Sequence, residues 1–365
     1  MSALATAIFL VLFVVAAGVG TMIALVRGAR HVRERRRARR AARPRRTLLA
    51  FAADGGDAER DELVRLPARD WRAVEPTVLE LLAKVRGEAR TALAEVFIRR
   101  GLVSRARRDL RRRGPVRRAR AAGVLGSLGH RSAVPELCRL LLDPNPDVRV
   151  AAVHSLGRIA DPAAAGPLLA SLAAPNPAPS QLVAHSLIQL GPAAVPALVA
   201  ALEEPTPLVR MTALDAVRLL GATVAEPEVA AVLRDDPSLE VRLRAVATLG
   251  RIGTRATMPH LLTACEPEQP AQLRAAAARA LGELGVVAAV APLQALLSSP
   301  DYRTGHEAAG ALLRLGAGGA AALAEAATGT DRAAGHAREV LALADLQREY
   351  AESIPQWPAG VAQGA

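Results

Sequence analysis

Three residues of this 365-residue chain have the types and the even spacing that a metal site needs. His154, His185 and Asp215 lie 31 and 30 residues apart, and imidazole and carboxylate groups together bind transition metals. If the three stand on consecutive helices, axes about 8–10 Å apart keep them from sharing one ion. We therefore expect no resident metal, and we interpret the three side chains as polar positions of a protein-binding groove.

Other catalytic signatures are absent from the sequence, which contains no HExxH, GxSxG, Walker or CxxC motif. Cys138 and Cys265 lie too far apart to indicate a zinc site or a disulfide framework. His306 and Glu307 form a single His-Glu pair. These observations predict a chain that is not an enzyme and holds no cofactor.

The elements that must position these residues repeat along the chain. Each period holds two amphipathic helices, such as 133–142 and 148–159, separated by a proline-containing turn. The second helix ends in a Leu-x-x-Leu/Ile-Gly phrase, and degenerate copies end at Gly101 and near Ala344. The seven clear copies end at Gly129, Ala160, Gly191, Gly221, Gly253, Gly285 and Gly316. Neither helix can bury its apolar face alone, so stacked pairs are expected to share a continuous core.

The repeated phrase acid-Pro-x4-Arg-x2-Ala-x3-Leu-Gly resembles the HEAT-repeat family, in a bacterial form similar to phycobilisome-lyase repeats. The resemblance implies an all-α, right-handed α-solenoid of about seven to nine helical hairpins within residues 71–350. It also implies a ladder of acids and arginines between neighbouring repeats, with interruptions at Ala174 and Ser299. If the Arg210 pair is exposed, its loss is expected to have a modest effect. The ladder residues are Asp143, Arg149, Glu204, Arg210, Asp236, Arg242, Glu268 and Arg274.

An uncharged stretch of 24 residues, Ala3–Val26, is long enough to cross a bilayer, which takes about 20 helical residues. No basic residue precedes it, and it exceeds the roughly 7–15-residue apolar part of a signal peptide. Residues 1–26 are therefore predicted to be an uncleaved transmembrane anchor. Residues 27–46 hold eleven arginines and one glutamate, and such positive flanks stay cytoplasmic. We expect a single-pass protein of the cell membrane with its N-terminus outside and its solenoid in the cytoplasm.

A second basic block, residues 99–120, also holds eleven arginines and one acid. It is either a solvated face or a contact with anionic lipid or an acidic partner. Nucleic acid is disfavoured, because grooves that bind strands usually add stacking aromatics and only 2% of this chain is aromatic. Across both blocks, the arginines assigned to lipid or acidic-partner contact are Arg33, Arg35, Arg36, Arg37, Arg39, Arg40, Arg105, Arg107, Arg108, Arg111, Arg112 and Arg113.

Polar and Gly-containing residues 47–70 are predicted to be a linker, and residues 351–365 a disordered tail. In the family that the chain resembles, second helices line the concave side. The partner-binding residues expected there are Val150, His154, Gln181, His185, Met211, Asp215, Leu243 and Arg279.

These features predict a non-catalytic cytoplasmic scaffold, anchored in the membrane, that binds a protein partner near the inner leaflet. The partner is expected to be another membrane protein or a synthase complex. Two alternatives stay open: a lyase-like or metal-dependent enzyme subunit, and a nucleic-acid-binding module.

Overall fold

The computed structural model describes residues 22, 27, 46–48, 50, 51, 56–85 and 87–353. Two compact units divide the chain: unit 1 spans residues 1–130 and unit 2 spans residues 131–365. Every regular element within these described ranges is a helix, and none is a strand. The all-helical class predicted from the sequence is confirmed.

The regular elements in the described residues of unit 1 are helices. Its helices are α2 (Asp57–Arg65), α3 (Ala68–Lys84), α4 (Gly87–Arg99), α5 (Leu102–Asp109) and α6 (Pro115–Leu128). Its core includes Trp71 and Phe97, whose rings meet edge to face at 5.2 Å. Arg100 lies 4.4 Å above the Trp71 ring and donates hydrogen bonds to the Leu63, Val64 and Leu66 carbonyls. This arginine therefore ties the end of α4 to the end of α2.

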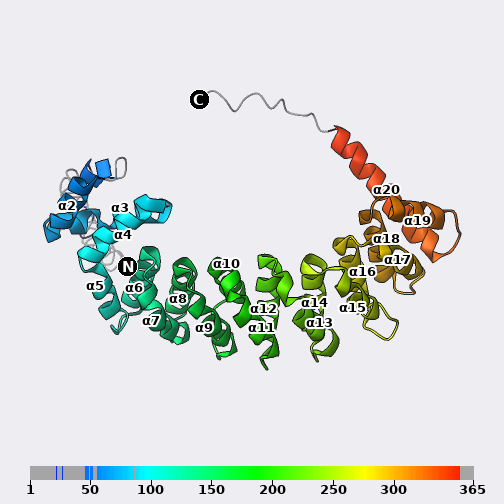
Figure 1. Ribbon diagram of the computed structural model, residues 1–365, viewed down its shortest axis with the longest axis horizontal. Coiled ribbons are helices and arrows are strands. Elements are labelled where there is room, and N and C mark those ends of the chain that lie inside the picture. The colour runs from blue at the N-terminus through cyan, green and yellow to red at the C-terminus, as the bar shows by residue number, and fades with distance from the viewer. Residues whose placement is uncertain are drawn as a thin grey trace, which may run out of the picture. The chain divides into compact units, whose positions relative to one another are not determined.

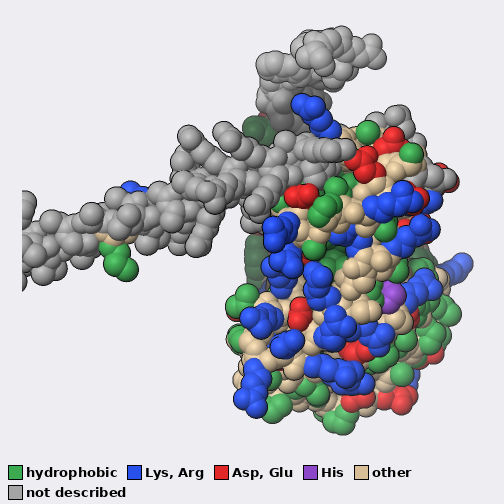
Figure 2. All heavy atoms as spheres, turned by 90° about the vertical axis from the view of Figure 1, so that its left-hand side faces the viewer, with side chains coloured by type: hydrophobic (Ala, Val, Ile, Leu, Met, Phe, Trp, Pro, Cys, Tyr) green, Lys and Arg blue, Asp and Glu red, His purple; other side chains and the backbone are tan. Residues whose placement is uncertain are grey.

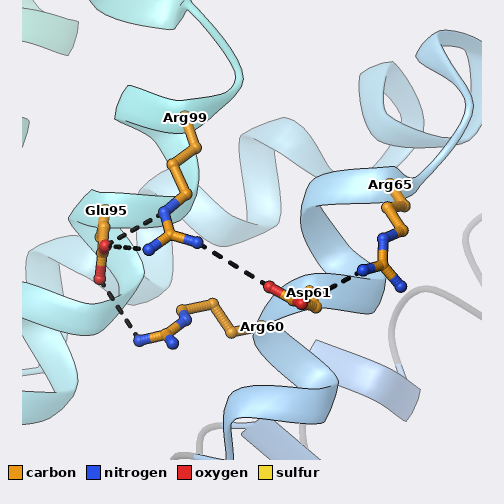
Figure 3. Close-up of polar contacts among 5 residues, drawn as sticks. All are labelled: Arg60, Asp61, Arg65, Glu95 and Arg99. Carbon is orange, nitrogen blue, oxygen red and sulfur yellow. Dashed lines mark hydrogen bonds and ion pairs between the residues drawn. The ribbon is translucent and has the colours of Figure 1, made fainter.

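The predicted linker at residues 47–70 is the clearest difference from the sequence analysis. Helix α2 lies within it, and Leu63 on that helix is fully buried. Leu48 and Phe51 are buried as well. Ion pairs also connect α2 to α4, with Arg60 Nη1 lying 3.4 Å from Glu95 Oε2 (Figure 3). The polar composition concealed the few apolar residues that anchor this segment.

Unit 2 is built from seven successive hairpins in the described residues. Over residues 134–284, Figure 1 shows the first and second helices along opposite edges. The first helices are α7 (Val134–Arg139), α9 (Ala165–Ala170), α11 (Val195–Ala200), α13 (Glu226–Asp235), α15 (Met258–Thr263), α17 (Val290–Leu296) and α19 (Ala317–Ala327). The second helices are α8 (Pro146–Ile159), α10 (Ser180–Leu190), α12 (Pro207–Leu220), α14 (Leu239–Ile252), α16 (Ala271–Leu284), α18 (Tyr302–Arg314) and α20 (Arg332–Ser353). Helix α20 continues past Ala344, where the sequence predicted a degenerate repeat to end.

Short 3-10 turns extend most of the first helices. They are η1 (Arg131–Ala133), η2 (Leu140–Leu142), η3 (Pro162–Ala164), η4 (Ser171–Ala173), η5 (Pro192–Ala194), η6 (Ala201–Glu203), η7 (Thr223–Ala225), η8 (Arg255–Thr257) and η9 (Val287–Ala289). Several first helices have a proline near their start. This position suits proline because an N–H group in the first turn has no acceptor within the helix, so no hydrogen bond is lost.

The repeat-ending residue reverses the chain at the end of several second helices. Gly221 and Gly285 adopt left-handed backbone angles, with φ of 65° and 71°. Glycine suits this conformation because it has no Cβ to clash. Ala160 adopts the same conformation with φ of 54°, so an alanine carries this steric strain in one repeat.

Small residues let neighbouring second helices approach closely. A Cβ added to Gly282 on α16 would lie 2.6 Å from the Ala311 Cα on α18. The absence of a side chain at Gly282 therefore sets the spacing of these two helices.

The arginine of the repeat phrase binds the turn before its own helix. Arg149 Nη1 donates to the Asp143 carbonyl at 2.8 Å. Arg210 Nη1 donates to the Glu204 and Pro205 carbonyls, also at 2.8 Å. Arg274 Nη1 binds the Pro267 and Gln269 carbonyls, on either side of Glu268, at 3.0 and 2.8 Å. In these turns the arginine meets backbone carbonyls rather than the carboxylate six residues earlier.

Contacts between repeats differ from one arginine to the next. Arg210 binds both carboxylate oxygens of Asp236 in the next repeat, at 2.7 and 3.0 Å. Arg242 instead binds the Gln269 side chain at 3.2 Å. The Nε atoms of Arg149 and Arg242 are buried without a hydrogen-bond partner. For Arg149, the acid position of the next repeat holds Ala174, which has no carboxylate to offer.

No single helix in the described ranges has both the length and the hydropathy to cross a bilayer. Helix α10 and the segment Pro192–Glu203 pass that test together but are bent by 112° relative to one another. Apart from Met22, the predicted anchor lies outside the described residues. The basic segment 27–46, apart from its two end residues, and residues 354–365 lie outside them too.

We predict that Gly282→Ala will lower the free energy of unfolding by about 1–3 kcal/mol, because the new methyl group overpacks the α16–α18 contact. Gly310→Ala on α18 is the matched control. Its new Cβ would meet only Arg314 Nη1, at 3.7 Å. This control should gain about 0.5–1 kcal/mol from helix propensity. Urea unfolding followed by circular dichroism measures both changes, and a stable Gly282→Ala chain would contradict the close approach.

Arg210→Ala should destabilise the chain by about 3 kcal/mol, because it leaves the Asp236 carboxylate buried and unpaired. The side chains of Arg210 and Asp236 are only 9% and 4% exposed, so the modest effect expected for an exposed pair does not apply. The control is Arg244→Ala, which removes an arginine that pairs with Asp215 but whose side chain is 46% exposed. That change should cost about 0.5 kcal/mol. If both variants lost the same free energy of unfolding in the urea titration, burial would not determine the contribution of these ion pairs to stability.

Candidate functional site

An arginine-rich face covers α5 and α6 of unit 1. On α5 the apolar residues Leu102, Val103 and Ala106 are buried, so helical spacing leaves the arginines outside. Figure 2 shows Lys and Arg side chains over much of this end of the molecule, with fewer acidic side chains between them. The arginines assigned from the sequence in this block, all of which are exposed, are Arg105, Arg107, Arg108, Arg111, Arg112 and Arg113.

A cavity of about 510 Å³ lies within this arginine-rich face. Its apolar lining consists of Leu102, Ala106, Ala121 and Val124. Two acids, Glu75 and Asp109, also line it. The arginines that line it are Arg72, Arg105, Arg112, Arg117 and Arg120. Several guanidinium groups therefore surround a hollow with an apolar lining, an arrangement suited to phosphate-bearing or carboxylate groups.

Most of the positive charge on α5, α6 and the loop between them is not neutralised within the described structure. Arg112 lies 3.9 Å from Asp109 in an exposed pair. No ion pair with a described residue forms at Arg105, Arg108, Arg111, Arg113, Arg117 or Arg120. By contrast, Arg60, Arg65 and Arg99 of α2 and α4 pair with Asp61 or Glu95, as Figure 3 shows. The face on α5 and α6 therefore keeps several arginines that a bound anion could pair with.

The sequence analysis missed part of the cavity. Arg117 and Arg120 lie about one turn apart on α6, and each precedes a buried residue, Ala121 or Val124, by four positions. This helical spacing would have predicted that both arginines lie on the side of α6 that lines the cavity. Arg72 comes from α3, and no local pattern connects it with α5.

The residues predicted to bind a partner lie on second helices that pack in sequence from α8 to α16. His154, Gln181, His185 and Arg279 are exposed. The remaining four residues, which are half-buried, are Val150, Met211, Asp215 and Leu243. This row therefore combines polar side chains with partly covered apolar ones, and partner binding there stays a prediction.

Ion pairs bridge this row from one repeat to the next. Asp215 lies 3.1 Å from Arg244 of α14, and Arg279 lies 3.8 Å from Glu307 of α18. His185 meets Gln189 of its own helix at 3.1 Å. Among the described residues, no group of three or more His, Cys, Asp or Glu side chains is arranged to hold a metal ion.

A cluster near the end of unit 2 was not predicted. The Tyr302 hydroxyl donates to Glu339 at 2.7 Å and so lowers the pKa of that carboxyl group. His306 also faces Glu339, at 3.6 Å, whereas the neighbouring Glu307 faces Arg279. The two neighbours in the sequence therefore make separate contacts: His306 faces the following second helix, α20, and Glu307 faces the preceding one, α16.

Comparison with known proteins gives a family match. A family model described as HEAT repeats matches residues 100–188, 195–273, 226–312 and 258–344. No curated protein sequence matches the chain significantly.

Solved structures similar to the chain have low sequence identity to it. A mutant of Kap121p is 12% identical with a TM-score of 0.50, over 76% of this chain and 36% of that one. Human deoxyhypusine hydroxylase is 20% identical with a TM-score of 0.31, over 73% of this chain and 99% of that one. The CpcE–CpcF complex of phycocyanin lyase from Nostoc sp. is 24% identical with a TM-score of 0.28, over 69% of this chain and 91% of that one. The likeness to Kap121p concerns the fold alone.

The two thiols are expected to react slowly. Burial, assisted by Asp161, raises the pKa of Cys138 to about 11, and burial raises the pKa of Cys265 to about 12. At pH 8 the thiolate fraction is then about one thousandth or less, and it grows as the pH rises. Alkylation by iodoacetamide, followed by mass spectrometry, should be far slower than in urea. A Ser104→Cys variant, exposed on α5, is the reactive control, and fast native alkylation of Cys265 would contradict its burial.

Proposed function

The chain belongs to the HEAT-repeat family, and from that premise we propose that it is a membrane-anchored scaffold. In this proposal it holds a protein partner beside the inner leaflet and contacts that leaflet through the arginine-rich face of α5 and α6. The observation that carries the lipid contact is the 510 Å³ cavity with five lining arginines, of which Arg105, Arg117 and Arg120 form no ion pair with a described residue.

The energetics favour such a contact. A basic residue near an anionic membrane surface contributes about 1 kcal/mol. Six exposed arginines on α5, α6 and the intervening loop form no ion pair with a described carboxylate. A lipid phosphate would therefore not have to displace a carboxylate in order to bind them. Guanidinium groups bind phosphates in a bidentate manner, which adds geometric selectivity. The predicted anchor, residues 1–26, would keep this face within reach of headgroups.

The scaffold role is supported by the arrangement of unit 2. Its second helices present a continuous row of exposed polar and partly exposed apolar side chains over successive repeats. Extended surfaces of this kind are what solenoids use to bind other proteins.

The experiment reconstitutes the full chain, carrying Ser104→Cys labelled with an environment-sensitive dye, into lipid nanodiscs. With phosphatidylglycerol present, the dye emission should shift to the blue relative to pure phosphatidylcholine. High salt should reverse the shift because it screens exposed charge. Changing the six predicted arginines of residues 105–113 to glutamine should abolish it.

A charge-matched control removes six exposed arginines from unit 2. Its substitutions are Arg131→Gln, Arg139→Gln, Arg158→Gln, Arg251→Gln, Arg255→Gln and Arg303→Gln. This control should keep the spectral shift. Identical spectra in the two lipids, or an equal loss in both variants, would overturn the lipid contact.

A further inference from the structure

A groove in unit 2 lies between two first helices, away from the second-helix row discussed above. Helix α11, turn η6 and helix α13 enclose a volume of about 780 Å³. The apolar residues that line it are Pro196, Val199, Ala200, Leu202, Pro205, Ala231, Val232 and Pro237. Its charged lining consists of Glu203, Glu204, Arg210, Glu228, Asp235 and Asp236.

The one cation among these lining residues is already engaged. Arg210 binds both oxygens of Asp236 and the carbonyls of Glu204 and Pro205. Its side chain is 9% exposed, so it cannot turn outward to neutralise the groove without breaking a buried pair.

Three carboxylates remain available. Glu203, Glu204 and Glu228 are exposed and have no ion pair with a described residue. Asp235 pairs with the adjacent Arg234 at 2.8 Å. The groove therefore offers about three uncompensated negative charges, from two neighbouring repeats, beside its apolar lining.

We propose that this groove binds a basic, partly apolar segment of a partner protein. Arginine or lysine heads would pair with the three glutamates, and their aliphatic stems would cover the apolar lining. An acidic segment or an anionic lipid would be repelled here. The proposal rests on the scaffold role and names the chemistry of the partner, but it does not depend on the lipid contact of unit 1.

The groove is preorganised for such a segment. The Arg210–Asp236 pair fixes the turn after η6 to the turn after α13, and prolines at 196, 205 and 237 restrict the backbone around it. A binding surface that is ordered beforehand loses less conformational entropy when a partner docks.

The test places the full chain in phosphatidylcholine nanodiscs, which present no net anionic lipid. The probe is a fluorescein-labelled peptide of repeated Arg-Val-Ala, and its anisotropy reports binding. Glu203→Gln, Glu204→Gln and Glu228→Gln together should weaken binding about tenfold, from three exposed pairs. A charge-matched set on the exposed acids Glu240, Glu266 and Glu268, each changed to glutamine, should leave affinity unchanged.

A second variant, Ala231→Trp, fills the groove and keeps every charge. It should weaken binding as well, whereas the same peptide with glutamate in place of arginine should not bind at all. Absence of binding to the unmodified chain, equal losses in the two charge sets, or no effect of Ala231→Trp would overturn the proposal.

The same measurements distinguish two other ligands that could fill the groove, namely the chain's own basic segment and a second copy of the chain. If deletion of residues 27–46 strengthens peptide binding, the groove is occupied by the chain's own basic segment and the partner assignment is wrong. If the peptide dissociates a dimer of the chain, a second copy is the occupant. If the peptide fails while the dye at position 104 still reports lipid, only this inference falls and the lipid contact stands.

Discussion

The structure of unit 2 depends on the stacking of helices that are too short to be stable alone. The α-helical part of several first helices is six residues long, and most second helices have eleven to fourteen. Isolated helices of this length are marginal in water. Side chains such as Leu156, Leu187 and Leu249 are fully buried because each second helix packs against the next. Stability is therefore shared between neighbouring repeats, and a close contact such as Gly282 to Ala311 affects both hairpins that meet there.

This architecture leaves most of the surface free of packing constraints. Only one stripe of each helix enters the core, so charged residues elsewhere are selected by solvation and by partners. Unit 1 presents an arginine-rich face with a hollow in it, whereas unit 2 contains a groove with exposed glutamates. Surfaces of opposite sign attract oppositely charged ligands, so these two surfaces would select different kinds of partner.

The arginines of the repeat phrase show how one position can serve different contacts. Each of Arg149, Arg210 and Arg274 binds carbonyls of the turn before its helix, which satisfies backbone groups that the turn leaves unpaired. Of the three, only Arg210 also binds a carboxylate of the next repeat, and both members of that pair line the acidic groove. The contact with the carbonyls depends only on the repeat that contains the arginine. The contact with a carboxylate also depends on which side chain the neighbouring repeat has at the acid position.

The amino-acid sequence by itself determined the helical repeats and their boundaries, because apolar spacing, prolines in turns and repeat-ending glycines act within one hairpin. It predicted α8 as residues 148–159, and the helix spans Pro146–Ile159. It also located the exposed arginines of residues 105–113. Only the tertiary structure brought Arg72 beside α5, packed α2 within the expected linker and formed the acidic groove. It also decided which contacts of the expected ladder form: Arg210 pairs with Asp236, whereas Arg242 binds Gln269. Arg210 and Asp236 lie 26 positions apart, and Arg60 and Glu95 lie 35 apart. No helical or turn periodicity specifies which side chains meet across such distances.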